Sequence, residues 1–172
     1  MELKEAIQDR RSIRRFGEKE VSKEFILELI ELGNMAPSAG NLQARDFVVV
    51  EDPDTRRELA RAALDQEFIA EAPISIVVCV NFERVAHYGA RGVTLYCLQD
   101  AAAAIQNMLL AIHAEGFGCV WVGAFNEEEV TRILDLPNFI RPVAILPIGE
   151  PLSQPEARKR IPVDELVHYE RW

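Results

Sequence analysis

The segment from Val93 to Glu115 constrains the fold most, because it is long and apolar around most of its circumference. Such a segment predicts a central, buried helix. A membrane span is not expected, because polar residues interrupt the segment at Gln99, Asp100, Gln106, Asn107 and His113. The alanines at 101–104 would allow another helix to approach closely. They fit a subunit interface, but packing in the core explains them at least as well.

Shorter patterns on both sides of this helix predict the remaining elements. Helices are expected over residues 2–9, from the N-cap Ser22 to about residue 34, from the cap Asp52 to about residue 64, and from the N-cap Asn126 to about residue 136. Apolar runs at residues 47–50, 74–80, 119–122 and 143–148 predict strands, and those at 47–50 and 74–80 are expected to be buried. Helices and strands do not alternate strictly, which indicates an α+β fold with a mixed sheet.

The length of the chain and its last segment predict the domain organisation. A chain of 172 residues is typical of a single domain, here residues 1–172. Residues 150–172 contain three prolines and are expected to form an extended tail that wraps around a partner subunit.

The charge balance and the cysteines exclude several classes of protein. The formal net charge is −9 and the sequence pI is about 4.9, which argues against a general nucleic-acid-binding protein. The chain has three cysteines that lie apart in apolar runs, as is typical of reduced thiols in the cytosol. The first residues have no apolar core, so no signal peptide is expected. The predicted location is therefore the cytoplasm.

Basic residues gather at two places in this acidic chain. Residues 10–16 read RRSIRRF, and residues 158–160 read RKR. Arginine binds phosphate well, because its planar guanidinium donates two parallel hydrogen bonds and stays charged. The two clusters therefore predict a phosphorylated small ligand, although each could also be a solvated basic segment. Residues 37–43 read PSAGNLQ and are rich in turn formers, so they predict a turn that could also be a binding loop.

A search for catalytic motifs gives no candidate for acid, base or nucleophile. The chain has no GxGxxG motif after a strand, no P-loop, no HExxH and no GxSxG. Its three histidines, His87, His113 and His168, lie far apart in the sequence, and no metal site is expected.

Five segments in order resemble the nitroreductase family of FMN enzymes. They are RRSIRRF at 10–16, APSAGNLQ at 36–43, GFGCVWVGAF at 116–125, PIGEP at 147–151, and the basic tail before Ile161 and Pro162. The chain departs from many members after Gln43, where it has Ala44 and Arg45 in place of Pro-Trp. It also lacks a long insertion between its central helices.

The resemblance implies a three-layer α+β sandwich with a mixed, mainly antiparallel sheet, and an intertwined homodimer with FMN at the interface. It implies that the phosphate and ribityl chain lie near Arg10, Arg11 and Ser12, with Arg14 at the N1/O2 edge of the ring. Pro37, Ser38 and Asn41 are expected from the other subunit. The remaining expected FMN-binding residues are Gln66, Trp121, Val122, Gly123, Arg158 and Arg160, with the Gly123 N–H near N5.

The implied activity takes hydride from NAD(P)H and passes it to a small conjugated acceptor, such as a nitroaromatic or quinone, by a ping-pong mechanism. The flavin carries the hydride, so the protein itself needs no catalytic acid or base. Alternatives are a flavin-binding sensor or store without turnover, and a specialised family reaction such as dehalogenation or flavin breakdown. A nucleic-acid-binding module using the residue 10–15 cluster is disfavoured by the acidic balance.

Overall fold

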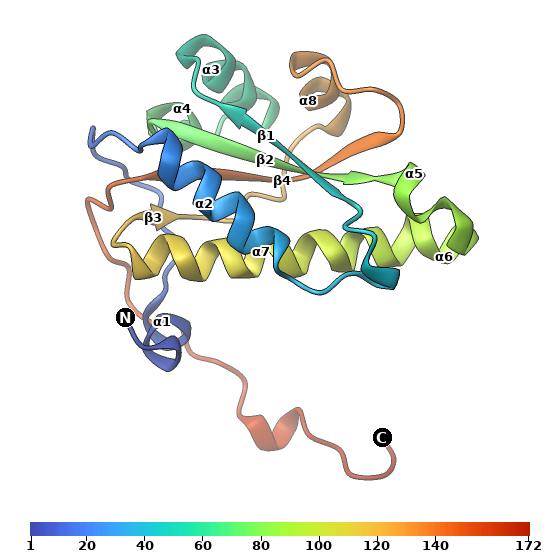
Figure 1. Ribbon diagram of the computed structural model, residues 1–172. Coiled ribbons are helices and arrows are strands. Elements are labelled where there is room, and N and C mark those ends of the chain that lie inside the picture. The colour runs from blue at the N-terminus through green and yellow to red at the C-terminus, as the bar shows by residue number, and fades with distance from the viewer.

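A computed structural model describes residues 1–172, and its centre is a four-stranded sheet (Figure 1). The strands are β1 (Arg45–Val50), β2 (Ile74–Asn81), β3 (Gly118–Cys119) and β4 (Ile140–Gly149), in the order β1-β2-β4-β3. Each strand pair is antiparallel, and a parallel contact occurs at an isolated bridge between Ser12 and Cys119. The predicted α+β fold with a mainly antiparallel sheet is confirmed.

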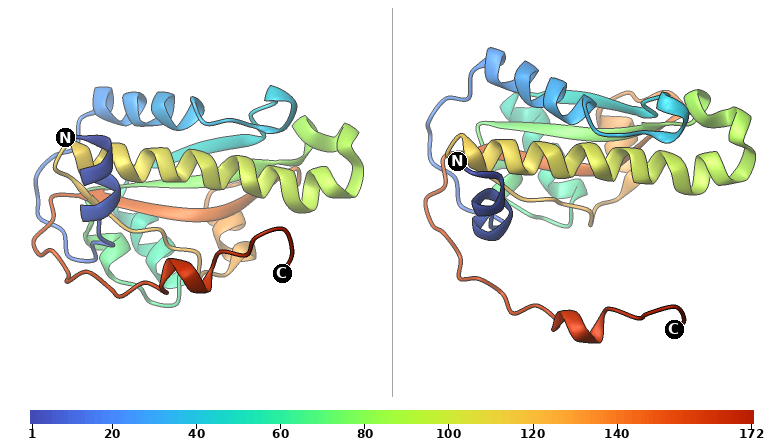
Figure 2. Two further views of the ribbon diagram at one scale, coloured as in Figure 1. Left: turned by 90° about the horizontal axis from the view of Figure 1, so that it is seen from below. Right: turned by 60° about the horizontal axis from the view of Figure 1, so that its bottom comes forward.

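Helices cover both faces of this sheet, which makes three layers (Figures 1 and 2). On one face lie α2 (Lys23–Asn34) and α7 (Cys97–Ala114), and on the other lie α3 (Pro53–Ala62), α4 (Phe68–Glu71) and α8 (Glu127–Ile133). The short helix α1 (Leu3–Asp9) contacts α7. Ser22, Asp52 and Asn126 each accept a hydrogen bond from the first turn of their helices, as the sequence predicted.

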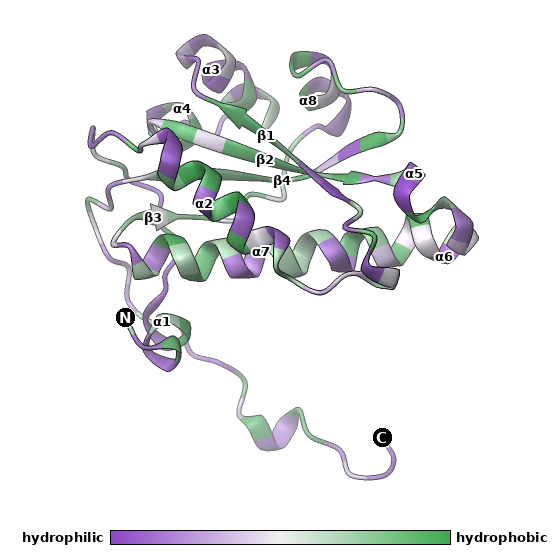
Figure 3. Cartoon of the chain, in the orientation of Figure 1, coloured by the Kyte–Doolittle hydropathy of each residue, from purple (hydrophilic) through white to green (hydrophobic).

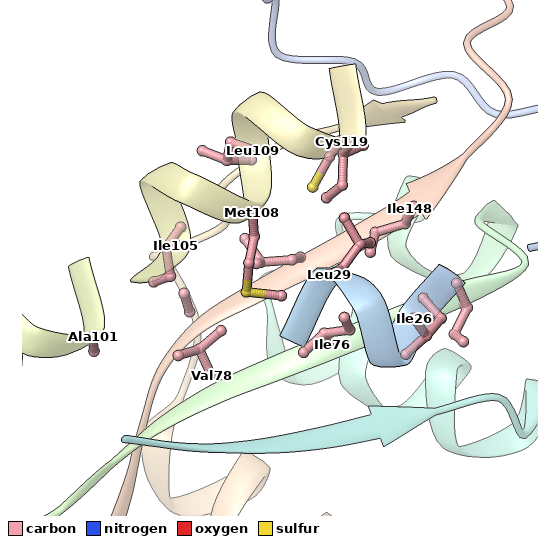
Figure 4. Close-up of a cluster of buried hydrophobic side chains, with 14 of the residues drawn as sticks. Ile26, Leu29, Ile76, Val78, Ala101, Ile105, Met108, Leu109, Cys119 and Ile148 are labelled. Atoms are coloured by element: carbon pink, nitrogen blue, oxygen red, sulfur yellow. The ribbon is translucent and has the colours of Figure 1, made fainter. Parts of the chain in front are cut away.

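Two hydrophobic clusters hold the layers together, and β2 contributes to both. Ile76 and Val78 point into the cluster beneath α2 and α7, together with Leu29 and Met108 (Figure 4). Val77 and Cys79 belong to the cluster beneath α3, α4 and α8. Because both faces of β2 are covered, every residue of the strand is buried, and residues 76–80 form a continuous apolar run rather than an alternating pattern.

Helix α7 is the end of a longer helical run that starts at Phe82. The run includes α5 (Phe82–Val85), α6 (Gly89–Arg91) and a π-helical turn at Gly92–Tyr96. By length and composition alone, Phe82–Ala114 could cross a membrane. Its buried residues, however, pack on α2 and the sheet, as in the core helix of a soluble protein. Gly116 ends α7 as the C′ residue of a Schellman motif, with a φ of +79° that glycine adopts without strain.

Three local predictions need correction. Strand β1 is at the edge of the sheet, so most of it is only half-buried. The strand expected at residues 119–122 ends at Cys119, and Val122 pairs separately with Ile145. Helix α8 ends at Ile133 rather than at about residue 136.

The last segment, residues 150–172, leaves the body of the protein (Figures 1 and 2). Its beginning is tied down, because the Leu152 N–H donates to the Arg15 carbonyl and the Gly17 N–H donates to the Glu150 carbonyl. Beyond this point all residues are exposed, and the segment contains one 3-10 turn at Val163–Glu165. Large hydrophobic side chains are exposed along the tail: Ile161, Val163, Leu166, Val167, Tyr169 and Trp172. Figure 3 shows that hydrophobic and hydrophilic residues are mixed along this segment.

Candidate functional site

The loop after α1 presents arginines to solvent from a firmly anchored backbone. Ile13 and Phe16 are buried, and the Ile13 N–H donates to the Cys119 carbonyl at 3.0 Å. Arg10 and Ser12 are half-buried, whereas Arg14 is exposed. Two exposed arginines, Arg14 and Arg15, thus lie between two buried apolar residues. The anchors therefore fix where the polar side chains of this loop lie.

The arginines of this loop have no carboxylate partner. The chain forms four ion pairs, and they use Lys23, Arg57, Arg84 and Arg141. Arg11 donates to the Gln8 carbonyl at 2.6 Å, and the Arg14 guanidinium lies 5.9 Å from the centre of the Phe68 ring. In a chain of net charge −9, these free guanidinium groups are suited to an external anion.

A second group of predicted site residues lies next to the same loop. The Gln66 amide donates to the Ala63 carbonyl at 2.7 Å and to the Ala124 carbonyl at 3.1 Å, which ties it to the residue after Gly123. Since Gln66 precedes Phe68 by two residues, the contact of Arg14 with Phe68 brings Arg14 into the same neighbourhood. We call Ser12, Arg14, Gln66, Phe68 and Gly123 the arginine surface.

The segment from Trp121 to Gly123 forms one border of the arginine surface. Val122 is buried and exchanges both backbone hydrogen bonds with Ile145, at 3.0 and 2.9 Å. Trp121 is 40% exposed. A Cβ added at Gly123 would meet no atom within 4 Å, so the space in front of this backbone is open. The Gly123 N–H has no acceptor within the chain, so it is free to donate to a ligand.

Arg10 and Arg11 also line a cavity of about 430 Å³ near the end of α7. Its wall includes Ile112 and His113 of that helix and Leu152 of the tail. Burial lowers the pKa of His113 and so favours its neutral form. Arg10 and Arg11 bring the guanidinium charge to this cavity.

The other predicted loop, residues 37–43, is well ordered by its own side chains. The Ser38 hydroxyl accepts from the Gln43 N–H at 3.1 Å and from its side-chain amide at 3.3 Å. Gly40 and Asn41 have φ angles of +58° and +57°, a conformation that glycine and asparagine tolerate best. We call residues 37–43 the proline loop.

The proline loop and the arginine-lined cavity lie at opposite ends of α7, because the loop contacts Asp100 and the cavity is lined by Ile112 and His113. Figure 1 shows α1, which leads into Arg10, near the C-terminal end of this helix. The Ala39 N–H donates to Asp100 in the first turn of α7, at 2.9 Å. His113, which lines the cavity with Arg10, lies thirteen residues further along, or about 20 Å at ~1.5 Å per residue. The structure therefore does not bring Pro37, Ser38 and Asn41 to Arg10 within one chain.

Arg158 and Arg160 also remain apart from the other predicted residues. Both are exposed on the tail, and Arg160 donates only to the Arg158 carbonyl, at 3.2 Å. The tail turns away from the body after Gln154, whose amide reaches the Asp9 carbonyl at 3.5 Å. The basic clusters suggested a phosphate-binding site between the two ends of one chain. This arrangement does not form such a site within one chain.

Two further groups of side chains bear on chemistry. The thiols of Cys79, Cys97 and Cys119 are buried, and burial raises the pKa of Cys79 to about 12 and that of the other two as well. They are poor nucleophiles at neutral pH. No three His, Cys, Asp or Glu side chains are grouped so that they could hold a metal ion.

The sequence did not single out two charged residues that shape the proline loop, Arg45 and Asp100. Both are buried, at 2% and 3% exposed. The signals for them were weak: Asp100 appeared as a polar interruption of an apolar helix, and Arg45 appeared as a departure after Gln43.

These features define an α+β sandwich with free arginines on one surface and an ordered polar loop about 20 Å away. The family model described as "Nitroreductase family" matches residues 7–68 and 60–150. The chain belongs to the nitroreductase family.

Individual relatives cover nearly the whole chain. It is 31% identical to the NADH dehydrogenase of Thermus thermophilus, over 97% of this chain and 95% of that one. It is 28% identical to the FMN reductase [NAD(P)H] of Bacillus subtilis, over 99% of this chain and 74% of that one. The solved NADPH:FMN oxidoreductase from Vibrio harveyi, complexed with NAD⁺, is similar with a TM-score of 0.91 and 29% identity, over 99% of this chain and 77% of that one.

Proposed function

We propose that this protein is an FMN-dependent oxidoreductase that takes hydride from NAD(P)H and reduces a small conjugated acceptor. The observation that carries the proposal is that Arg10, Arg11 and Arg14 have no carboxylate partner, while the backbone of Gly123 on the arginine surface is open. The names of the relatives support the cofactors, since one is an FMN reductase and another was solved with NAD⁺. Residues 1–172 act as one domain, and the protein works in the cytoplasm.

The donors in the loop after α1 fit FMN in number and kind. Arg10, Arg11 and Ser12 offer two guanidinium groups and a hydroxyl for the phosphate and ribityl chain. The open space at Gly123 admits a planar ring, which a side chain at this position would obstruct. Bound FMN supplies the hydride chemistry.

The protein's own residues bind and orient the ring. The Gly123 N–H donates toward N5, with Trp121 and Val122 beside it. Arg14 places positive charge at the N1/O2 edge, where it favours the reduced form. The Gln66 amide lies at the pyrimidine end, held by the Ala63 and Ala124 carbonyls.

Two copies of the chain complete each site in this proposal. The proline loop lies too far from Arg10 to serve the same flavin within one chain, so Pro37, Ser38 and Asn41 come from the partner subunit. The apolar side chains on the exposed tail need a surface to cover them. Residues 150–172 therefore wrap around the partner, where Arg158 and Arg160 add charge near the phosphate. No nucleic acid or membrane takes part.

An absorption spectrum of the purified protein tests flavin binding, and NAD(P)H oxidation with a quinone or nitroaromatic tests turnover. We expect about one FMN per chain and weaker FMN binding by Arg10→Ala, about 10- to 100-fold for a lost charged hydrogen bond. FMN binding without steady-state NAD(P)H oxidation would instead support a flavin sensor or store. Unchanged flavin binding by Arg10→Ala would contradict the phosphate assignment.

A further inference from the structure

The guanidinium of Arg45 is buried beneath the proline loop and donates to several carbonyl oxygens at once. Its Nη2 donates to the carbonyls of Asn34 and Ala36, both at 2.8 Å. Its Nη1 donates to the Asp100 carbonyl at 3.0 Å. These contacts join the end of α2 and the first turn of α7 to the start of β1. A single side chain therefore fixes the backbone that leads into the loop.

The carboxylate of Asp100 binds the same loop from the opposite direction. Oδ1 accepts from the Ala39 N–H at 2.9 Å, and Oδ2 accepts from the Ala44 N–H at 3.4 Å. These two amides lie before and after the positive-φ residues Gly40 and Asn41. The carboxylate thus holds the loop closed across its strained centre.

The two buried charges depend on each other without a direct ion pair. Burial lowers the pKa of Arg45, and the negative charge of Asp100 acts in the opposite direction. The guanidinium binds carbonyls, while the carboxylate binds amides, so the loop backbone lies between opposite charges. Buried charges are costly unless they are compensated and hydrogen-bonded. An arrangement of this kind favours one backbone conformation over its alternatives.

We propose that Arg45 and Asp100 are positioning residues that hold the proline loop in its flavin-binding conformation before the flavin arrives. This inference rests on the proposed function, in which Pro37, Ser38 and Asn41 contact the flavin. Neither Arg45 nor Asp100 is itself placed at the flavin. Their effect is on the fraction of protein whose loop is ready to bind, and the apparent Kd rises as that fraction falls.

The test compares Arg45→Met, which keeps an unbranched side chain but removes the donors, with Arg45→Lys, which keeps the charge but lacks the planar fork. Arg132→Met is the matched control, because Arg132 is exposed and its guanidinium has no hydrogen-bond partner. Amide hydrogen exchange of the flavin-free protein is measured over residues 38–44, with β2 as an internal reference. FMN affinity and turnover at saturating FMN are measured on the same variants.

We expect Arg45→Met to exchange faster over residues 38–44 while β2 stays protected. Its Kd for FMN should rise about tenfold if the fraction of protein with the loop in its flavin-binding conformation falls to about a tenth. Turnover at saturating FMN should stay within about twofold of wild type, because FMN binding restores the loop. Arg45→Lys should be intermediate, and Arg132→Met should match wild type.

Wild-type exchange and FMN affinity in Arg45→Met would overturn the inference. So would a loss of turnover at saturating FMN with unchanged exchange. If Arg45→Met does not fold, Asp100→Asn decides by the same measurements, since one of its two loop amides loses its acceptor. A wild-type protein that binds no FMN would contradict the proposed function, whereas the exchange data separately report whether Arg45 orders the loop.

Discussion

Gly123 and Gly116 are both exposed glycines at which an added Cβ would meet no atom within 4 Å. They differ in backbone, because only Gly116 has a positive φ angle. Gly116→Ala should therefore destabilise the fold by about 1 kcal/mol through backbone strain. Gly123→Ala should leave the free energy of unfolding within about 0.5 kcal/mol of wild type.

The same two variants should differ in FMN affinity. At Gly123 the new methyl group would occupy the space proposed for the ring, so we expect at least about a tenfold higher Kd, or ~1.4 kcal/mol. Gly116→Ala should change the Kd much less. Urea unfolding and flavin titration measure the two quantities. Equal FMN affinity in Gly123→Ala and wild type would contradict the placement of the flavin ring at Gly123.

Arg14 offers a test of charge at the ring edge. Arg14→Met removes the charge and keeps much of the apolar stem. If the charge favours the reduced flavin by about 1–3 kcal/mol, the midpoint potential should fall by about 20–65 mV. A redox titration of the flavin-loaded variant measures this shift. Arg15→Met is the control, since Arg15 is a neighbouring exposed arginine that is not placed at the flavin. A midpoint potential equal to wild type in Arg14→Met would contradict the placement of Arg14 at the flavin ring.

At the scale of secondary structure, one ion pair joins α8 to β4. Arg141 donates to both carboxylate oxygens of Glu127, at 2.8 and 2.6 Å. The hydrogen bond from Arg141 lowers the pKa of Glu127 below its usual value of 4.5. The pair should therefore stabilise the fold above about pH 4.5, and this stabilisation should be lost as the pH falls through the lowered pKa.

Glu127→Gln measures that contribution. Because both side chains are more than 40% exposed, we expect a loss of at most about 1 kcal/mol at pH 7. The difference from wild type should shrink toward pH 3. Glu128→Gln, a neighbour without an ion pair, is the control. A deficit in Glu127→Gln that does not depend on pH would show that the pair contributes through packing instead.

Local signals predicted the helices well and the sheet less well. Ser22, Asp52 and Asn126 cap helices through contacts three residues away, so the sequence nearby contains the whole signal. The edge position of β1 and the break before Val122 depend on partners far along the chain. The buried roles of Arg45 and Asp100 could not be predicted for the same reason, because they exist only once distant carbonyls and amides meet.

For the molecule as a whole, the site residues came from the family resemblance rather than from local physics. The basic clusters predicted an anion, and the prolines of residues 150–172 predicted the extended tail that carries Arg158. The sequence alone did not indicate that α7 would keep Asn41 away from Arg10, because that separation depends on how the elements pack.

Deleting residues 155–172 tests what the tail does. We expect the truncated chain to lose FMN affinity and to dissociate at concentrations where the full chain is dimeric, because the exposed apolar side chains of the tail are gone. Light scattering and flavin titration measure this. The double variant Arg158→Ala and Arg160→Ala should remain dimeric but bind FMN more weakly. A truncated chain that stays dimeric with full FMN affinity would contradict the wrapping tail.

The separation of Arg10 from Asn41 along α7 also has a genetic consequence. If each site combines Arg10 of one chain with Asn41 of the other, a chain with Arg10→Ala and a chain with Asn41→Ala can complement each other in one dimer. A hybrid of the two variants would hold one site with both defects and one with neither. Equal mixing with free exchange gives hybrids in about half of the dimers, so about a quarter of all sites would be intact. Two alleles that each weaken FMN binding would then restore part of the tight binding when they are expressed together.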